Sequence, residues 1–190
     1  MLYCVSMATE VNVLETQYNT LREVMPSSVF PSYDELMDMV PLSWAFAAYG
    51  VVHGFIGAEV VVSFCLDEIS RKETSDDNDI ALLYSSDNDS ERLEVIKSRV
   101  PEDELENNDL SHQWMRVLLW MCCQKVGDVD SLLDCVELIY AEFDYPKEIA
   151  PFIRYMPNCG LASDKEGLAN ALRAHMEDIM VLKKGNERKG

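Results

Sequence analysis

Two consecutive stretches, residues 110–126 and 128–143, have the most regular apolar spacing in this 190-residue chain. Their apolar residues recur every three or four positions, which places them on one face of an α-helix. In the second stretch these residues are Val129, Leu132, Leu133, Val136, Ile139, Tyr140 and Phe143. Gly127 ends the first helix and Asp128 can cap the second, so the connection between them is short. A short connection predicts an antiparallel helical hairpin.

The stretch that follows, residues 137–157, ends the second helix and is rich in aromatic residues. The chain turns at Tyr145-Pro146, where Asp144 can cap a new helix and Pro146 suits its first turn. The residues that can then close over the hairpin are Phe152, Ile153 and Tyr155. We expect this stretch to serve packing, with a ligand groove as the alternative.

Residues 42–65 form an almost uncharged run that is long enough to cross a lipid bilayer. His53 and Glu59 interrupt it, and three glycines fall inside it. Because a carboxylate in lipid is costly, we expect two buried helices instead, at 42–53 and 58–71, hinged between them. Glu59 either caps the second helix or, if buried among apolar residues, has a raised pKa, and the cap is the preferred interpretation.

The rest of the pattern is also helical. Residues 8–25 predict a helix that the prolines after it detach as an arm. A capping box at Ser32 starts a short helix, residues 91–100 form another, and a capping box at Ser163 starts a last helix to about residue 184. The fold class is therefore all-α, with seven to eight helices in a compact bundle or in stacked antiparallel pairs. We expect an N-terminal arm at 1–30, one domain at 31–184 and a frayed tail at 185–190.

The formal net charge of −18 is the strongest global feature of the sequence. Binding to nucleic acid or to an anionic membrane requires clustered Lys and Arg, so neither is expected as a partner. Between residues 73 and 109 there are thirteen acidic residues and three basic ones, so ten of the eighteen excess negative charges lie there. This segment serves solubility in the simplest interpretation, and it allows a basic protein or a cation as partner.

The sequence contains no recognisable catalytic or metal-binding pattern. None of its three histidines has the spacing of a metal-ligand set. Residues 87–91 resemble the start of a calcium loop, but Arg92 stands where that loop needs Gly and Ser98 stands where it needs Glu. We therefore predict no catalytic residue, no metal and no cofactor, and a binding role is favoured over an enzyme.

Six cysteines are distributed without any C-x-x-C pair, and most of them lie among apolar residues. A free cysteine in that setting behaves as a small hydrophobe, so no disulfide framework is expected. The first residues lack the basic and apolar regions of a secretory signal peptide, and either Met1 or Met7 can be the start. These features predict a protein of the reducing cytoplasm.

Two stretches of the chain are distinctive as motifs. They are Phe143-Asp-Tyr-Pro-Lys-Glu-Ile-Ala-Pro-Phe-Ile-Arg-Tyr-Met-Pro157, with the pattern F-x-Y-P-x-E-I…Y-M-P, and Pro41-Leu-Ser-Trp-Ala-Phe-Ala-Ala-Tyr-Gly50. Together they resemble a family of small uncharacterised bacterial proteins, catalogued as a domain of unknown function. The resemblance covers roughly residues 34–157 and leaves residues 1–30 and the last helix outside. It implies a helical fold and a cytoplasmic bacterial setting, and it implies no activity and no site residue.

The first functional hypothesis is a non-enzymatic acidic interaction protein that binds a basic protein partner. Its most concrete form is an immunity-type inhibitor of a toxin, since such inhibitors gain association rate from opposite charge. The predicted partner-binding residues are Asp76, Asp77, Asp79, Asp87, Asp89, Glu102, Asp103, Glu104 and Glu106.

The alternative hypothesis is a small-ligand-binding or enzymatic helical protein with an aromatic-lined pocket. The residues predicted to line that pocket are Trp44, Tyr49, His53, Trp114 and Tyr155. A third hypothesis is a homodimer with a scaffold role, in which the helix at residues 8–25 supplies the interface.

Overall fold

A computed structural model of the protein describes residues 20–72, 77–84, 89–105, 107–156 and 164–187. Across these residues the chain forms helices and no strand, which confirms the all-α fold class. The α-helices are α2 (Thr20–Val24), α3 (Tyr33–Met39), α4 (Trp44–Val52), α5 (Ala58–Lys72), α6 (Asp77–Tyr84), α7 (Asp89–Ser98), α8 (Glu102–Leu105), α9 (Asn108–Lys125), α10 (Val129–Glu142) and α11 (Lys165–Glu187). Two 3-10 helices, η1 (Ser27–Val29) and η2 (Ala150–Phe152), lie between them.

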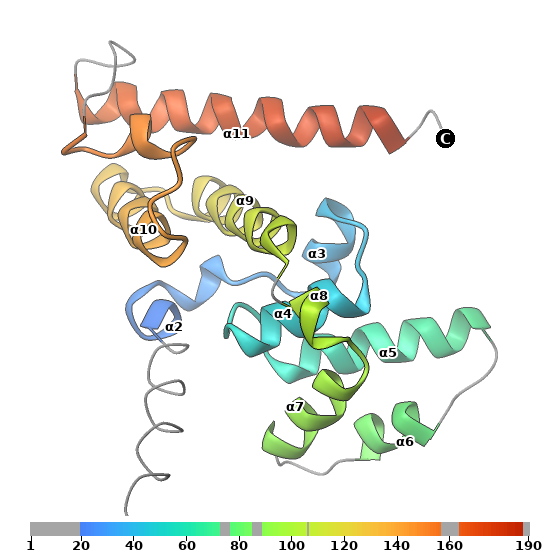
Figure 1. The fold of residues 1–190 in the computed structure, drawn as a ribbon. Coiled ribbons are helices and arrows are strands. Elements are labelled where there is room, and N and C mark those ends of the chain that lie inside the picture. The colour runs from blue at the N-terminus through green and yellow to red at the C-terminus, as the bar shows by residue number, and fades with distance from the viewer. Residues whose placement is uncertain (1–19, 73–76, 85–88, 106, 157–163, 188–190) are drawn as a thin grey trace, which may run out of the picture.

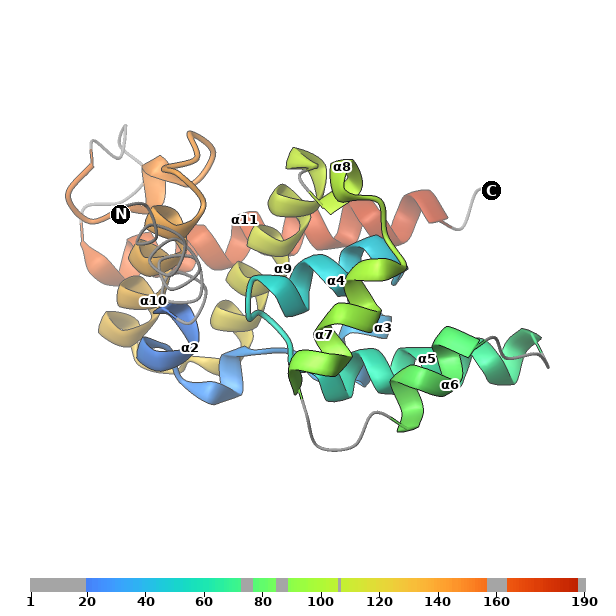
Figure 2. The same cartoon turned by 60° about the horizontal axis from the view of Figure 1, so that its bottom comes forward.

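The helices form two groups that share one core. Figure 1 shows α11 lying across the α9–α10 hairpin at one end of the molecule, with α3 to α8 at the other end. Helix α4 contacts α5, α7, α8 and α9, so it joins the two groups. The second view shows the same contact between α4 and α9, and it shows α5 and α6 side by side (Figure 2).

The predicted hairpin is confirmed, with caps at both of its helix starts. Asn107 accepts a hydrogen bond from the backbone N–H of Asp109 at 2.8 Å, which caps α9. Asp128 accepts one from the backbone N–H of Ser131 at 2.8 Å, which caps α10 as the sequence predicted. These side chains satisfy N–H groups that have no partner within the helix.

Trp114 on α9 is the central anchor between the two groups of helices. Its indole Nε1–H donates to the carbonyl oxygen of Phe46 at 2.9 Å, and its ring stacks on the Phe46 ring at 4.3 Å between centroids. The indole also lies against the backbone of α4 at Gly50, where an added Cβ would fall 2.2 Å from a ring carbon. Because glycine has no Cβ, α4 and α9 can approach closely at this point.

The uncharged run at 42–65 forms the two helices α4 and α5, as predicted. Between them the chain turns at Gly54, which has a φ of 71°, and the N–H of Phe55 returns to the carbonyl of Gly50 at 2.7 Å. Among the described residues, no helix is both long and apolar enough to cross a membrane. Glu59 is the second residue of α5 and has an exposed side chain, so it lies in the first turn, where an acid favours the helix dipole. Among the described residues its carboxylate makes no capping hydrogen bond.

The turn after α10 differs from the prediction of a new capped α-helix. The N–H of Asp144 bonds to the carbonyl of Ala141 at 3.3 Å, and the N–H of Tyr145 bonds to that of Tyr140 at 2.9 Å. Asp144 and Tyr145 have φ values of 56° and 57°, so Asp144 belongs to a C-terminal cap of α10. An N-cap would require extended backbone at Asp144.

No α-helix follows this turn, because Pro151 lacks the N–H that a continuing helix needs. The chain forms instead a turn and the 3-10 helix η2. Phe152 and Ile153 are buried against the hairpin as predicted. The third predicted residue, Tyr155, is 64% exposed, so it does not close over the core.

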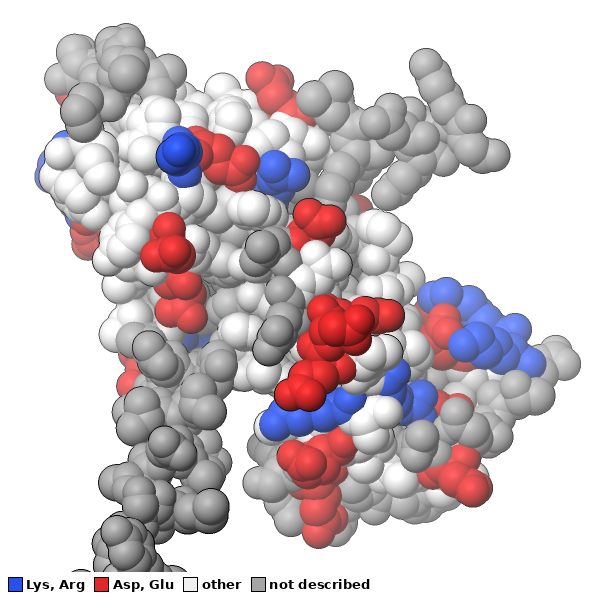
Figure 3. All heavy atoms as spheres, viewed as in Figure 1, with Lys and Arg blue, Asp and Glu red and all other residues white. Residues whose placement is uncertain are grey.

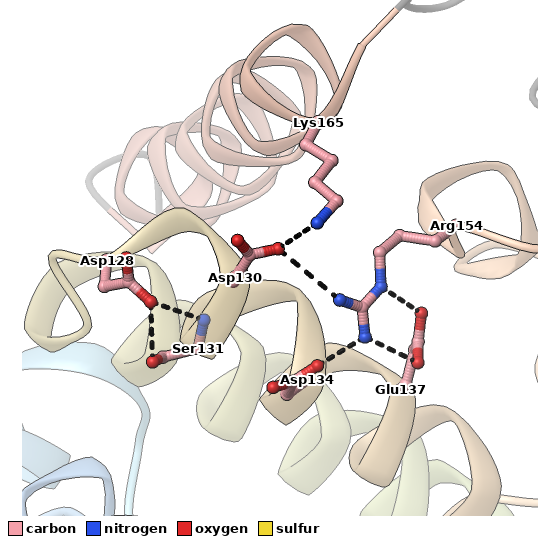
Figure 4. A network of polar contacts seen from close by, with 7 residues as sticks. All are labelled: Asp128, Asp130, Ser131, Asp134, Glu137, Arg154 and Lys165. Atoms are coloured by element: carbon pink, nitrogen blue, oxygen red, sulfur yellow. Dashed lines mark hydrogen bonds and ion pairs between the residues drawn. The ribbon is translucent and has the colours of Figure 1, made fainter.

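A set of ion pairs fastens this returning segment to α10 (Figure 4). Arg154 contacts Asp130, Asp134 and Glu137, which lie along one side of α10. Lys165, at the start of α11, contacts Asp130 as well. One row of carboxylates on α10 therefore holds two later parts of the chain.

The ends of the described chain are also tied to the core. Leu21 of α2 and Met25, which follows α2, are buried in the same cluster as α9 and α10 residues, although the sequence places them in the arm. Residues 8–19 of that predicted arm lie outside the described residues. At α11, Asp164 accepts the backbone N–H of Gly167 at 2.8 Å, so Asp164 caps this helix one residue after the predicted Ser163.

Candidate functional site

The acidic segment between residues 73 and 109 folds mostly into the short helices α6, α7 and α8. Leu82 of α6 and Ile96 of α7 are fully buried, so each helix is held by an apolar inner face. Pro101 separates α7 from α8, since the backbone before a proline is driven away from helical conformation. The acidic residues are left mainly on the outer faces.

Five acids of helices α6, α7 and α8 are exposed and form no ion pair within the described part of the chain. They are Asp77, Glu91, Glu102, Asp103 and Glu104, and we call this set the acidic surface. Figure 3 shows acidic side chains gathered over α7 and α8 on one face of the molecule. Ile80 shares the outer face of α6 with Asp77 and is 46% exposed, so the surface also offers an apolar side chain.

The acidic surface is not uniformly negative. In the same view, Lys and Arg side chains lie between the acidic atoms over α8 and those over α7 (Figure 3). Lys97 lies 3.7 Å from the Glu94 carboxylate within α7. A partner that fits this face would therefore meet two acidic groups separated by a basic strip.

Asp79 was predicted as a partner-binding residue, and the structure places it inside the fold. Its carboxylate accepts a hydrogen bond from the Arg99 guanidinium at 2.7 Å, and the two side chains are only 14% and 10% exposed. The thiol of Cys65 donates to the same carboxylate at 3.4 Å, and Arg99 lies over the Trp44 ring at 4.2 Å. Asp79 thus joins α6 to α4, α5 and the end of α7.

Four other predicted partner-binding residues are not located by side chain. Asp76, Asp87 and Glu106 lie outside the described residues. Asp89 is the first residue of α7, and its side chain is likewise outside the described part. The described members of the predicted set that lie on the acidic surface are Asp77, Glu102, Asp103 and Glu104.

Three of the five residues of the alternative aromatic pocket meet in one ring cluster. Trp114 is fully buried, Tyr49 is buried, and His53 stacks on Tyr49 at 4.0 Å between centroids. Phe55 fills the space between them, 5.5 Å from Trp114 and 5.7 Å from His53. Burial lowers the pKa of His53, because the charged imidazolium loses its hydration there.

The other two residues of the alternative pocket lie outside this cluster. Trp44 packs edge-on against Phe64 at 4.9 Å and covers the Arg99 guanidinium. Tyr155 is exposed beyond η2, and partial loss of hydration, followed by the nearby Glu137 carboxylate, raises its pKa. The five residues therefore do not surround a common space.

A recess of about 520 Å³ lies elsewhere, where α2, η1, α3, α5 and the end of α9 meet. It is lined by Arg22, Ser27, Ser28, Phe30, Pro31, Ser32, Tyr33, Glu35, Glu59, Val60, Ser63 and Lys125. Sequence reasoning did not find this site, because its lining comes from five elements and shares no local spacing. The one available signal was the capping box at Ser32, which fixes Glu35 at the rim.

The cysteines that the structure describes are free and buried. They are Cys65, Cys122, Cys123 and Cys135. Burial raises the pKa of the Cys123 thiol to about 12, and a hydrogen bond with Cys135 together with burial raises that of Cys122. Buried thiols of this kind are poor nucleophiles. Within the described ranges, no group of three or more His, Cys, Asp and Glu side chains could hold a metal ion.

The fold and its surface define a small all-α protein with a strongly acidic outer face. The chain belongs to a family of uncharacterized proteins conserved in bacteria (DUF2247), whose model matches residues 33–179. This confirms the resemblance to an uncharacterised bacterial family. The match runs into α11 as far as residue 179. The expectation that the last helix lies outside the family was therefore wrong. Neither the curated proteins nor the solved structures give a match to this chain.

Proposed function

We propose that this protein is a non-enzymatic interaction protein that binds a basic protein partner through the acidic surface of α6 to α8. The supporting observation is that these carboxylates are exposed and have no counter-ion in the described chain. Exposed carboxylates without a counter-ion attract a partner of the opposite charge and accelerate encounter.

Several carboxylates elsewhere in the protein have counter-ions within the fold. On α5, Asp67 and Glu68 contact Arg71, and Glu68 also contacts Lys72 at 2.6 Å. On α10, three carboxylates contact Arg154. The fold supplies counter-ions at these places. Among the described residues it supplies none for the five carboxylates of the acidic surface, and their gathering on one face supports an external role for that surface.

An immunity-type protein that neutralises a basic toxin is the most concrete form of this proposal. The proposed setting is the reducing bacterial cytoplasm, which suits the free thiols. A homodimer through residues 8–25 is a separate proposal, and Leu21 and Met25 are already buried in the chain's own core. Its interface would therefore rest on residues 8–19, and light scattering on a chain that lacks them tests it.

The experiment compares three baits in extracts of the source bacterium. One is the unaltered protein, and the second carries Glu102→Gln, Asp103→Asn and Glu104→Gln. The third is a matched control with the same loss of charge on exposed residues of α11: Glu166→Gln, Glu177→Gln and Asp178→Asn. We expect a basic protein to be retained by the first and third baits and lost by the second. Equal retention by all three baits, or equal loss from the second and third, would contradict the proposal.

A further inference from the structure

The recess between α2, η1, α3, α5 and the end of α9 contains four charged side chains, two acidic and two basic. Two of its four charged side chains neutralise each other: Lys125 donates to Glu35 at 2.7 Å. Glu35 is further fixed by the capping box, in which it accepts the backbone N–H of Ser32 at 2.9 Å. These bonds with Lys125 and Ser32 lower the pKa of Glu35, so the carboxylate stays charged and occupied.

The other two charged side chains have no such partner among the described residues. Arg22 lies with its guanidinium over the Phe30 ring, 5.2 Å from the centroid, and contacts no carboxylate within the described part of the chain. A guanidinium on an aromatic face keeps its planar donors available at the edge. Arg22 is therefore a positioned cation that lacks an anion.

Glu59, which lines the same recess from α5, is the opposite case. Its carboxylate folds back so closely over Gly57 that a Cβ there would fall 2.0 Å from a carboxylate oxygen. The hydroxyl of Ser63 donates to the main-chain carbonyl of Glu59 at 3.1 Å and leaves the carboxylate itself free. Across the described residues, this carboxylate has neither an ion pair nor a hydrogen bond. Glu59 is thus an anion that lacks a cation, in the same recess as Arg22.

From this arrangement we propose that the recess binds a small zwitterion, with the chemistry of a free amino acid. The ligand's carboxylate would take the edge of the Arg22 guanidinium, which can donate two parallel hydrogen bonds. Its ammonium group would take the Glu59 carboxylate. The serine hydroxyls of the lining can both donate and accept, so they suit either end of such a ligand.

The size of the recess agrees with this class of ligand. Its volume of about 520 Å³ falls within the range of small-molecule sites. Phe30 and Val60 give the lining an apolar part against which a ligand side chain can pack. The site shares no residue with the acidic surface, so its failure and that of the proposed function can be told apart.

The test is calorimetric titration of the whole protein with the twenty common amino acids, each at up to about 10 mM. We expect at least one to bind with a dissociation constant of about 1 mM or tighter. The matching acid without the amine, and the matching amine without the carboxylate, should each bind at least roughly tenfold more weakly. Absence of binding across the panel, or equal binding of a half-ligand, would overturn the proposal.

Variants then assign the site. Arg22→Gln and Glu59→Gln should each weaken binding by roughly tenfold or more, because each removes one charge-assisted contact. Arg71→Gln and Glu91→Gln, which alter exposed charges outside the recess, should leave it unchanged. Amide chemical shifts of the unaltered protein provide a readout that does not depend on variant folding. They should change in residues 27–35 and 57–63, and changes confined to other parts of the chain would overturn the site.

Discussion

Arg154 donates two parallel hydrogen bonds to the Glu137 carboxylate from one edge of its guanidinium. Its Nε donates to Oε1 at 2.7 Å and its Nη2 donates to Oε2 at 2.9 Å (Figure 4). The Arg154 side chain is 27% exposed and that of Glu137 is 23% exposed. Two parallel bonds from one guanidinium fix orientation as well as distance. This contact holds the segment after η2 against α10, and the same guanidinium reaches Asp134 one turn earlier.

The substitution Arg154→Lys should lower the free energy of unfolding by about 1–2 kcal/mol, because lysine cannot reproduce the two-bonded contact. Urea denaturation measures the change. Lys165→Gln is the matched control, since its ion pair with Asp130 is more than half exposed on both sides. We expect less than about 0.5 kcal/mol from the control. Equal effects from both variants would show that the Arg154 contact is an ordinary surface ion pair.

Gly50→Ala should be strongly destabilising. The added Cβ would lie 2.2 Å from a ring carbon of Trp114, which is itself buried and hydrogen-bonded to Phe46. Overpacking of this kind costs about 1–3 kcal/mol and displaces the ring. Thermal unfolding and tryptophan fluorescence both report it. Gly127→Ala is the control, because nothing lies within 4 Å of its added Cβ, and we expect it to leave both readouts nearly unchanged.

Asp79→Asn and Asp77→Asn, two changes on the same helix, should separate a structural acid from a surface acid. Removing the Asp79 charge breaks its ion pair with Arg99, in which both side chains are largely shielded from water, and loss of such a pair costs roughly 3 kcal/mol. Asp77 is exposed, so its replacement should change the free energy of unfolding by less than about 0.5 kcal/mol. Denaturant midpoints give both free energies of unfolding. Similar losses for the two variants would show that Asp79 has no structural role beyond that of a surface acid.

The stability of the fold should decrease as the pH falls through the range in which an unfolded histidine takes up a proton, about 6.5. Burial lowers the pKa of His53 in the folded state, so below that pH the unfolded chain binds a proton that the folded chain does not. Denaturation of the unaltered protein at pH 7.5 and 5.5 should therefore show a loss that His53→Gln reduces. His112→Gln, on an exposed residue, should keep the full loss. An identical pH dependence in all three proteins would exclude His53 as the cause.

Much of the fold could be predicted from the sequence because it follows from local chemistry. Asp128 could be predicted to cap α10, because an Asp directly before a strongly periodic apolar stretch is a typical N-cap. The run at 42–65 divides into α4 and α5 because its glycines and Glu59 suit a turn between soluble helices better than a bilayer. Asp144 was mispredicted because its conformation depends on the cap of the preceding helix and on Pro151, which blocks the next one.

The candidate sites could not be predicted from residue spacing, because the tertiary fold determines which side chains lie together. Asp79 has the same sequence surroundings as Asp77, and its burial arises from Arg99, which is twenty residues away. Trp44 and Tyr155 were grouped with Trp114 as rings, although the tertiary fold separates them. Arg22 on α2 and Glu59 on α5 line the same recess, although they are far apart in the sequence and no local pattern relates them.

We propose that the acidic surface of α6 to α8 captures a basic partner by charge. The most direct test of this proposal is the association rate of the captured partner, measured by stopped flow from low to high salt. We predict a rate that falls steeply with salt, and a decrease of roughly tenfold at low salt for the Glu102→Gln, Asp103→Asn, Glu104→Gln variant. The difference should vanish near about 1 M salt, where charges are screened over a few ångströms. An association rate that is insensitive to salt, or equally slowed by the control changes on α11, would contradict the account.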